Sequence, residues 1–85
     1  MKVLSFQRFH FGDKVKWDEM FESETELIES LKSIDVEEFK KKGCNGYAYV
    51  EGFQLTLKFG NELSKKQLTQ LKRIAKEIYK YHKNL

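Results

Sequence analysis

The residues best suited to chemistry are basic side chains near the end of the chain. Between residues 65 and 83 they recur mostly at helical intervals. At about 100° per residue they fall within one arc of roughly 100°. Such a row of cations matches the phosphates of a nucleic-acid backbone, or equally an acidic groove on a protein. It is also how an amphipathic helix stays soluble. Six residues form this basic stripe, with Lys66 at its edge: Lys65, Lys72, Arg73, Lys76, Lys80 and Lys83.

Two tyrosines are the second candidate site. Tyr47 and Tyr49 alternate with apolar residues, so on a strand both rings lie on the outer face beside Lys58. Solvent-facing rings next to a cation can stack on bases or anchor a protein partner. The alternative is that another segment covers this face and the tyrosines serve only as strand formers.

The charge is unevenly distributed along the chain. Residues 18–38 carry nine acids and one lysine, whereas residues 39–85 carry eleven basic groups and three acids. Several of the acids stand where helix starts favour negative charge. They can also pair with the basic stripe, within one molecule or between two, or repel nucleic acid from one side.

Catalytic and metal chemistry find little support. His10 and His82 are far apart, and neither belongs to a motif with metal-ligand spacing. Cys44 follows three lysines, which would lower its pKa, but the sequence pairs it with no base. Phosphate-binding, dinucleotide-binding and EF-hand motifs are missing, as are the motifs of common RNA-binding domains. We therefore expect no enzyme activity, no cofactor and no metal.

Three helices are expected to position these residues. Ser23 to Glu26 forms a capping box that opens a helix with Leu27, Leu31 and neighbouring apolar residues. Asp35 opens a short helix that ends at Gly43. Ser64 to Gln67 forms another capping box, and the helix that it opens is expected to run to about Lys83, roughly 27 Å.

Two β-hairpins complete the expected fold. A turn at Glu51-Gly52 pairs the strands of residues 47–50 and 53–59 and collects their apolar residues on one face. A loop at residues 12–14 pairs Phe9 and Phe11 with Trp17 and Val15. Alternatively, a helix begins near Lys14, since Trp17, Met20 and Phe21 also have helical spacing.

The sequence thus predicts a small α+β fold of ββα-ββα order. Residues 1–85 form a single domain, with an antiparallel sheet, helices on one of its faces and a long basic amphipathic C-terminal helix. No run approaches the 18 apolar residues of a membrane span, and the start does not resemble a signal peptide. A lone cysteine fits a reducing, cytoplasmic compartment.

Three hypotheses for function follow. The leading one is a non-enzymatic binding module whose basic stripe engages nucleic acid or a nucleic-acid-handling protein. The alternative is an inhibitor or adaptor of the kind found in phages and mobile elements, acting by protein–protein contact, for example by blocking a host defence nuclease. The third is a module that self-associates by pairing its oppositely charged regions, as a homo-oligomer.

Overall fold

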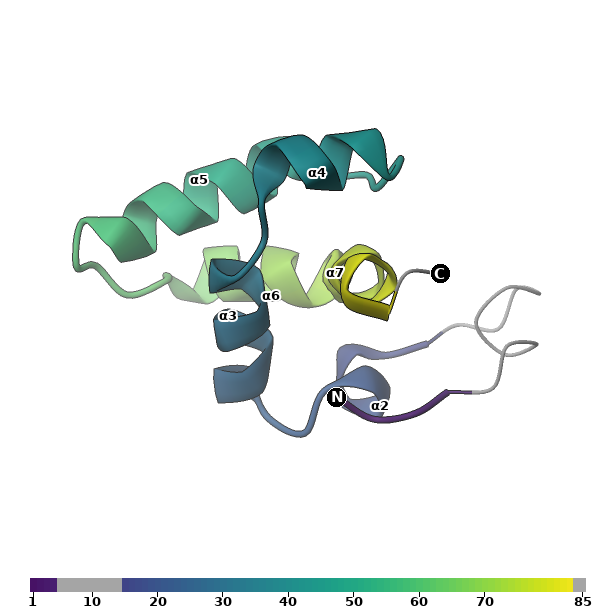
Figure 1. Cartoon of the computed structure of the whole chain (residues 1–85). Helices are drawn as coiled ribbons and strands as arrows, with labels where there is room; N and C mark the ends of the chain where they lie inside the picture. The colour runs from purple at the N-terminus through teal and green to yellow at the C-terminus, as the bar shows by residue number, and fades with distance from the viewer. Residues whose placement is uncertain (5–14, 84–85) are drawn as a thin grey trace.

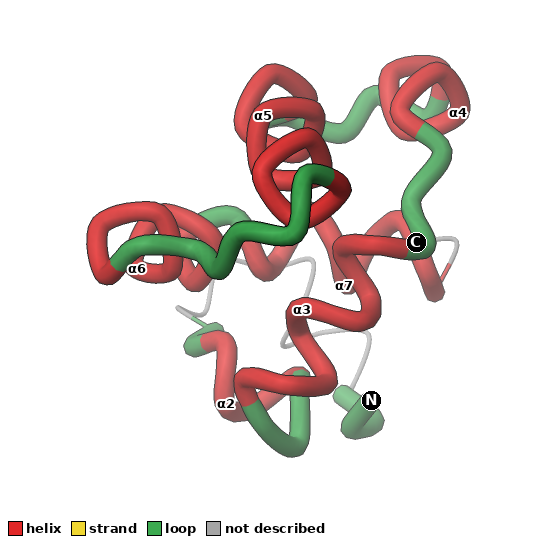
Figure 2. Tube along the Cα trace, turned by 90° about the vertical axis from the view of Figure 1, so that its left-hand side faces the viewer, coloured by secondary structure: helices red, strands yellow, loops and turns green. Residues whose placement is uncertain are grey.

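The computed structural model describes residues 1–4 and 15–83, and all regular structure in these residues is helical. The predicted α+β fold with a sheet of two hairpins is therefore wrong: the described part of the chain has no strand (Figure 2). The helices are α2 (Trp17–Met20), α3 (Glu24–Lys32), α4 (Val36–Lys41), α5 (Tyr47–Lys58), α6 (Lys65–Arg73) and α7 (Ala75–Lys83).

The helices enclose one hydrophobic cluster. In Figures 1 and 2, α4 and α5 lie together on one side, α2 lies on the opposite side, and α7 passes between them. Helix α7 contacts α2, α3 and α6, while α5 contacts α3, α4 and α6. Burial of apolar side chains between these helices drives the packing. Fully buried members of the core come from α2 to α7: Met20, Phe21, Leu27, Leu31, Phe39, Val50, Leu71, Ala75 and Ile78.

The three predicted helix starts are confirmed. The Ser23 hydroxyl accepts a hydrogen bond from the Glu26 N–H at 3.1 Å, although the Glu26 carboxylate accepts from the Glu22 N–H at 3.4 Å rather than from Ser23. Asp35 caps α4 by accepting from two backbone N–H groups. Ser64 and Gln67 exchange both bonds of a capping box, at 2.9 and 3.1 Å. Each bond satisfies a backbone donor at the helix start that lacks an intrahelical partner.

Residues 47–58 form helix α5, which overturns the predicted hairpin. Gly46 adopts the left-handed region at φ 87°, and its carbonyl accepts the N–H of Val50 at 3.1 Å to close the first turn. Val50 and Phe53 are buried, and Leu57 packs against the same cluster one turn later. The segment is apolar on two sides, so its pattern fits a helix as well as a strand. Packing of one side against α3, α4 and α6 favours the helix.

The predicted C-terminal helix is interrupted. Ile74, at φ −94° and ψ 6°, separates α6 from α7. In Figure 1, α6 runs across the view whereas α7 is seen nearly along its axis. Leu71 of α6 and Ala75 and Ile78 of α7 have the spacing of a single helix face, and all three remain in the core across the break.

The N-terminal hairpin is also corrected where it can be compared. Phe9, Phe11 and the loop at residues 12–14 lie outside the described residues. Trp17 belongs to α2 rather than to a strand, and Met20 and Phe21 are fully buried. The alternative of helix rather than strand is confirmed for Trp17–Met20, but as the separate turn α2 and not as an early start of α3.

Candidate nucleic-acid interface

The break at Ile74 divides the basic stripe into two rows. Lys65, Lys72 and Arg73 lie on α6, whereas Lys76, Lys80 and Lys83 lie on α7. Because the two helices point in different directions (Figure 1), the predicted straight row of cations about 27 Å long does not form. Each row has to be considered as a surface of its own.

The α6 row is the more open of the two. Leu71 faces the core, and on the opposite side Lys65, Lys66 and Arg73 are exposed together with Thr69. The Thr69 hydroxyl donates to the Lys65 carbonyl at 2.9 Å, so the side chain lies along the helix and leaves room for the cations. We call Lys65, Lys66, Thr69 and Arg73 the α6 face.

Lys72, at the edge of this face, is partly exposed and makes contacts within the molecule. Its Nζ lies 3.5 Å from Glu24 Oε2, at the start of α3, and 4.8 Å from the centroid of the Trp17 ring. A cation over an indole face and beside a carboxylate is attracted to both. One acid of the 18–38 region therefore pairs with the basic stripe. Others act locally: Asp35 caps α4, and Glu29 and Glu38 pair with lysines on their own helices.

Trp17 and the cations around it form a surface pocket of about 530 Å³. Three cationic side chains and one carboxylate surround a partly exposed indole, and Thr69 also lines the pocket. Cations can hold phosphate oxygens, and an indole can stack on a base. The lining comes from the segment before α2, from α2 and from α6: Val15, Lys16, Trp17, Asp18, Thr69, Lys72 and Arg73.

Sequence reasoning did not place Lys16, Trp17 and Thr69 in a site. Trp17 was assigned to a hairpin, which would have separated it from residues 65–73. The helical spacing of Trp17, Met20 and Phe21 was the signal that places it elsewhere. With Met20 and Phe21 anchored in the core, α2 holds the indole beside α6.

The α7 row has a different environment. The Lys83 Nζ lies 5.7 Å from the centroid of the Tyr79 ring on its own helix. The charge of Lys80 lowers the pKa of Cys44, which lies between α4 and α5, although burial outweighs this effect. Lys76 and Lys80 are only partly exposed. These cations are less available than those of the α6 face.

Tyr47 and Tyr49 do not form the predicted pair. Two residues apart on a helix, their side chains point about 200° apart. Lys40 Nζ lies 4.6 Å from the centroid of the Tyr47 ring, whereas the Tyr49 ring lies 6.1 Å from that of Phe53. Both rings are about half exposed, at 46% and 50%. The predicted stacking surface required both tyrosines on one face of a strand. Because residues 47–58 form a helix, the two rings do not share a face.

The remaining nucleophile and histidine have structural surroundings. Cys44 is buried, and this burial, reinforced by Glu77, raises the pKa of its thiol despite Lys80 and Lys42. The predicted lowering by the preceding lysines acts through Lys42, but burial and Glu77 outweigh it, so the net direction is the opposite of the one expected. The His82 Nε2 lies 2.8 Å from the Ser30 carbonyl and links α7 to α3. Within residues 1–4 and 15–83 no group of three or more His, Cys, Asp or Glu side chains could hold a metal ion.

No family model, curated protein or solved structure matches this chain. Among the described helices, none combines the length and the apolar character needed to cross a bilayer. The pocket beside Trp17 and the α6 face thus have to be interpreted from their own chemistry.

Proposed function

We propose that this protein binds single-stranded nucleic acid, with the phosphate backbone along the α6 face and one base in the pocket beside Trp17. The observation that carries the proposal is the convergence of an indole with Lys16, Lys72 and Arg73 in one pocket. Surfaces that bind single strands combine two components, namely cations that bind the phosphates and aromatic rings on which bases stack.

The α6 face has a suitable length for the backbone. Lys65 and Arg73 are eight residues apart, which is about 12 Å along a helix. Phosphates along one strand of a duplex recur at about 3.4 Å of helix axis and lie farther apart in an unstacked single strand, so this distance spans at most about three to four of them. Lys66 adds a third cation between the two ends.

The position of Lys72 favours an unpaired base. Because its ammonium lies over the Trp17 ring, the indole is fixed in orientation and one of its faces is already occupied. A base that stacks there has to present its own flat face, and a base in the interior of a duplex cannot do so. Asp18 lies in the same lining and would repel a phosphate, so we expect the backbone to follow Arg73 and the α6 face.

The sole tryptophan supplies a direct test. Trp17 fluorescence is titrated with an oligothymidylate and with a duplex of equal length. We expect quenching by the single strand and an affinity that falls with salt. The variant K65E/R73E should bind at least about tenfold more weakly, and its slope of log K against log salt should decrease by about 1.4, for two lost contacts to a single strand.

A matched control separates the site from net charge. The variant K32E/K41E changes the total charge equally but on α3 and α4, whose lysines belong neither to the α6 face nor to the lining of the pocket. It should leave the affinity within about twofold, because long-range attraction is screened at physiological salt. Equal weakening by both variants would show that only total charge matters and would exclude the proposed site.

The other two hypotheses predict different outcomes. An inhibitor or adaptor would show no nucleic-acid binding at low salt and would retain a protein partner after nuclease treatment. Self-association through opposite charges would disappear at high salt. The Glu24–Lys72 ion pair is formed within one chain, so these two groups are not free to pair between copies.

A further inference from the structure

Helix α5 is apolar on two opposite sides. One side, with Val50, Phe53 and Leu57, packs against the core. The opposite side carries a row at helical spacing in which all four residues are exposed, including Leu55 at 47% and Phe59 at 75%. We call this the outer row, and it consists of Ala48, Gly52, Leu55 and Phe59, the last being the residue that caps the helix.

An apolar stripe on a helix normally faces a packing partner. Here the outer row is open to solvent in the described structure, and it does not belong to the proposed nucleic-acid site on α2 and α6. Figure 1 shows α5 at the edge of the molecule, with α6 and α3 on its inner side. The row is therefore a surface that another chain can cover.

We propose that the outer row is the contact between two copies of this chain, with the two α5 helices packed antiparallel about a two-fold axis. The side chains of the outer row are small in its N-terminal half (Ala48 and Gly52) and large in its C-terminal half (Leu55 and Phe59). With the axis between residues 53 and 54, Ala48 faces Phe59 of the second copy, and Gly52 faces Leu55 of the second copy. Each large side chain then fills the space left by a small one, which lets the helices approach closely.

The charges beside the outer row fit the same arrangement. At about 100° per residue, Glu51 and Lys58 lie on the same edge of the row, about 20° apart. A two-fold axis across antiparallel helices brings this edge against the same edge of the second copy. Glu51 then lies within about 3 Å, along the helix axis, of Lys58 of the second copy. The two opposite charges meet twice, once on each side of the axis.

A parallel arrangement lacks this complementarity. A two-fold axis parallel to the helices would bring the edge with Glu51 and Lys58 against the other edge of the row, which carries the uncharged Tyr49 and Thr56. It would also place Phe59 opposite Phe59 of the second copy, and two large rings at one level hold the helices apart. The antiparallel dimer is thus the one that both shape and charge favour.

The mass of the protein in solution tests the proposal. By sedimentation equilibrium, we expect it to double as concentration rises, with a Kd of about 10–100 µM because one helix pair is a small interface. The variant L55Q/F59Q should stay monomeric over the same range. Val3→Gln, which removes another exposed apolar side chain (88% exposed) outside α5, should dimerise as the original does.

The charged edge provides a sharper test. Glu51→Lys or Lys58→Glu alone should weaken the dimer at least about fivefold, since each creates two like-charge contacts. The double variant E51K/K58E should regain it. An equimolar mixture of the two single variants should form a heterodimer, because each chain then supplies the charge that the other lacks.

Three results would overturn the proposal. The first is a monomer at every concentration. The second is a dimer that L55Q/F59Q does not weaken. The third is a dimer that is lost in 1 M salt. At this salt concentration the screening length is about 3 Å, so pairing of the oppositely charged regions should be lost, whereas an apolar contact should persist. Near-UV circular dichroism of L55Q/F59Q checks that its core is unchanged.

Discussion

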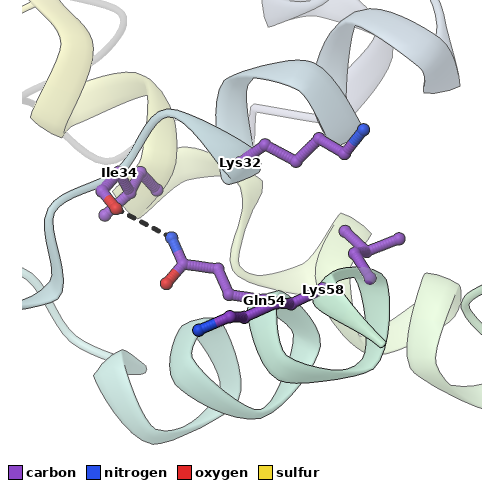
Figure 3. Close-up of a pocket in the computed structure, with 5 residues that line it drawn as sticks. Lys32, Ile34, Gln54 and Lys58 are labelled. Carbon is purple, nitrogen blue, oxygen red and sulfur yellow. Dashed lines mark hydrogen bonds between the residues drawn. The ribbon is translucent and has the colours of Figure 1, made fainter. Parts of the chain in front are cut away.

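The carboxamide nitrogen of Gln54 on α5 lies 2.8 Å from the carbonyl oxygen of Ile34, just beyond the end of α3 (Figure 3). The same nitrogen also donates to the carbonyl of Leu31 at 3.0 Å. One side chain therefore donates to two backbone carbonyls at the end of α3, of which that of Leu31 also accepts the Ile34 N–H at 3.2 Å. It also joins the two helices that flank the core.

Replacement of Gln54 should destabilise the fold, because the new side chain does not supply the N–H donor that both carbonyls use. Gln54→Met keeps the side-chain length but leaves both carbonyls without this donor, and we expect a loss of about 1–3 kcal/mol in the free energy of unfolding. Gln54→Glu should lose more at pH 7, because a carboxylate faces two carbonyl oxygens.

Urea denaturation monitored by circular dichroism measures both variants of Gln54. The stability of Gln54→Glu should recover partly at pH 4, where a protonated carboxyl can donate one hydrogen bond. If Gln54→Glu is as stable as the original protein at pH 7, the two hydrogen bonds contribute nothing.

Gly46 should not tolerate a side chain. Its φ of 87° lies in the left-handed region, and a Cβ there would stand 3.3 Å from Ile74 Cγ2, at the break between α6 and α7. We expect Gly46→Ala to destabilise the protein by about 1–3 kcal/mol, from backbone strain and from the shift that Ile74 has to make. Thermal unfolding at low protein concentration measures the loss.

Gly52 is the matched control for Gly46, since it lies inside α5 and a Cβ there meets nothing within 4 Å. Glycine in a helix interior costs about 0.5–1 kcal/mol relative to alanine. Gly52→Ala should therefore stabilise the monomer by about that amount. Opposite signs at two glycines six residues apart are expected only if residues 47–58 are helical, because a hairpin would place Gly52 in its turn.

The sequence was informative where capping chemistry is local. Ser23, Asp35 and Ser64 each open a helix as predicted, because a short polar side chain can satisfy nearby backbone donors whatever the rest of the chain does. The basic character of residues 65–83 was equally visible. These signals do not indicate the direction of a helix axis. The sequence therefore did not predict the break at Ile74, where the chain changes direction between α6 and α7.

The error at residues 47–58 has a physical origin. Ala48, Val50, Leu55 and Leu57 alternate like a strand, and Glu51-Gly52 resembles a tight turn. The alternation arises because the helix is apolar on its core side and on its outer row. A rule that assigns one apolar face to each element cannot separate the two periods, and contacts with α3, α4 and α6 decide between them.

Because of Glu26, the free energy of unfolding should decrease at acidic pH. The amino group of Met1 lies 2.8 Å from its carboxylate and, together with the Glu22 N–H, lowers the pKa of Glu26 below the usual 4.5 although partial desolvation opposes this. The folded state therefore binds this proton less readily than the unfolded state does. The contribution is complete above pH 4.5 and is lost as pH falls through the folded-state pKa.

The variant Glu26→Gln isolates this contribution. Its unfolding free energy should be lower than that of the original protein at pH 7, and the difference should shrink as pH falls below 4.5. Glu29→Gln removes an exposed carboxylate from the same helix and serves as a control. Parallel pH profiles for the original protein and Glu26→Gln would mean that the Glu26 carboxylate is not stabilised in the folded state.

Cys44 should react only when the protein opens. The side chain is buried at 5% exposure, and burial raises the pKa of the thiol, so little thiolate is present near neutral pH and reagents cannot reach it. We expect labelling by a disulfide reagent to be much slower than in the urea-unfolded chain. The rate should increase in Gly46→Ala, since that residue lies two positions away and its strain favours opening of the segment before α5. Rapid labelling of the folded protein, at the rate of the unfolded chain, would place the thiol at the surface.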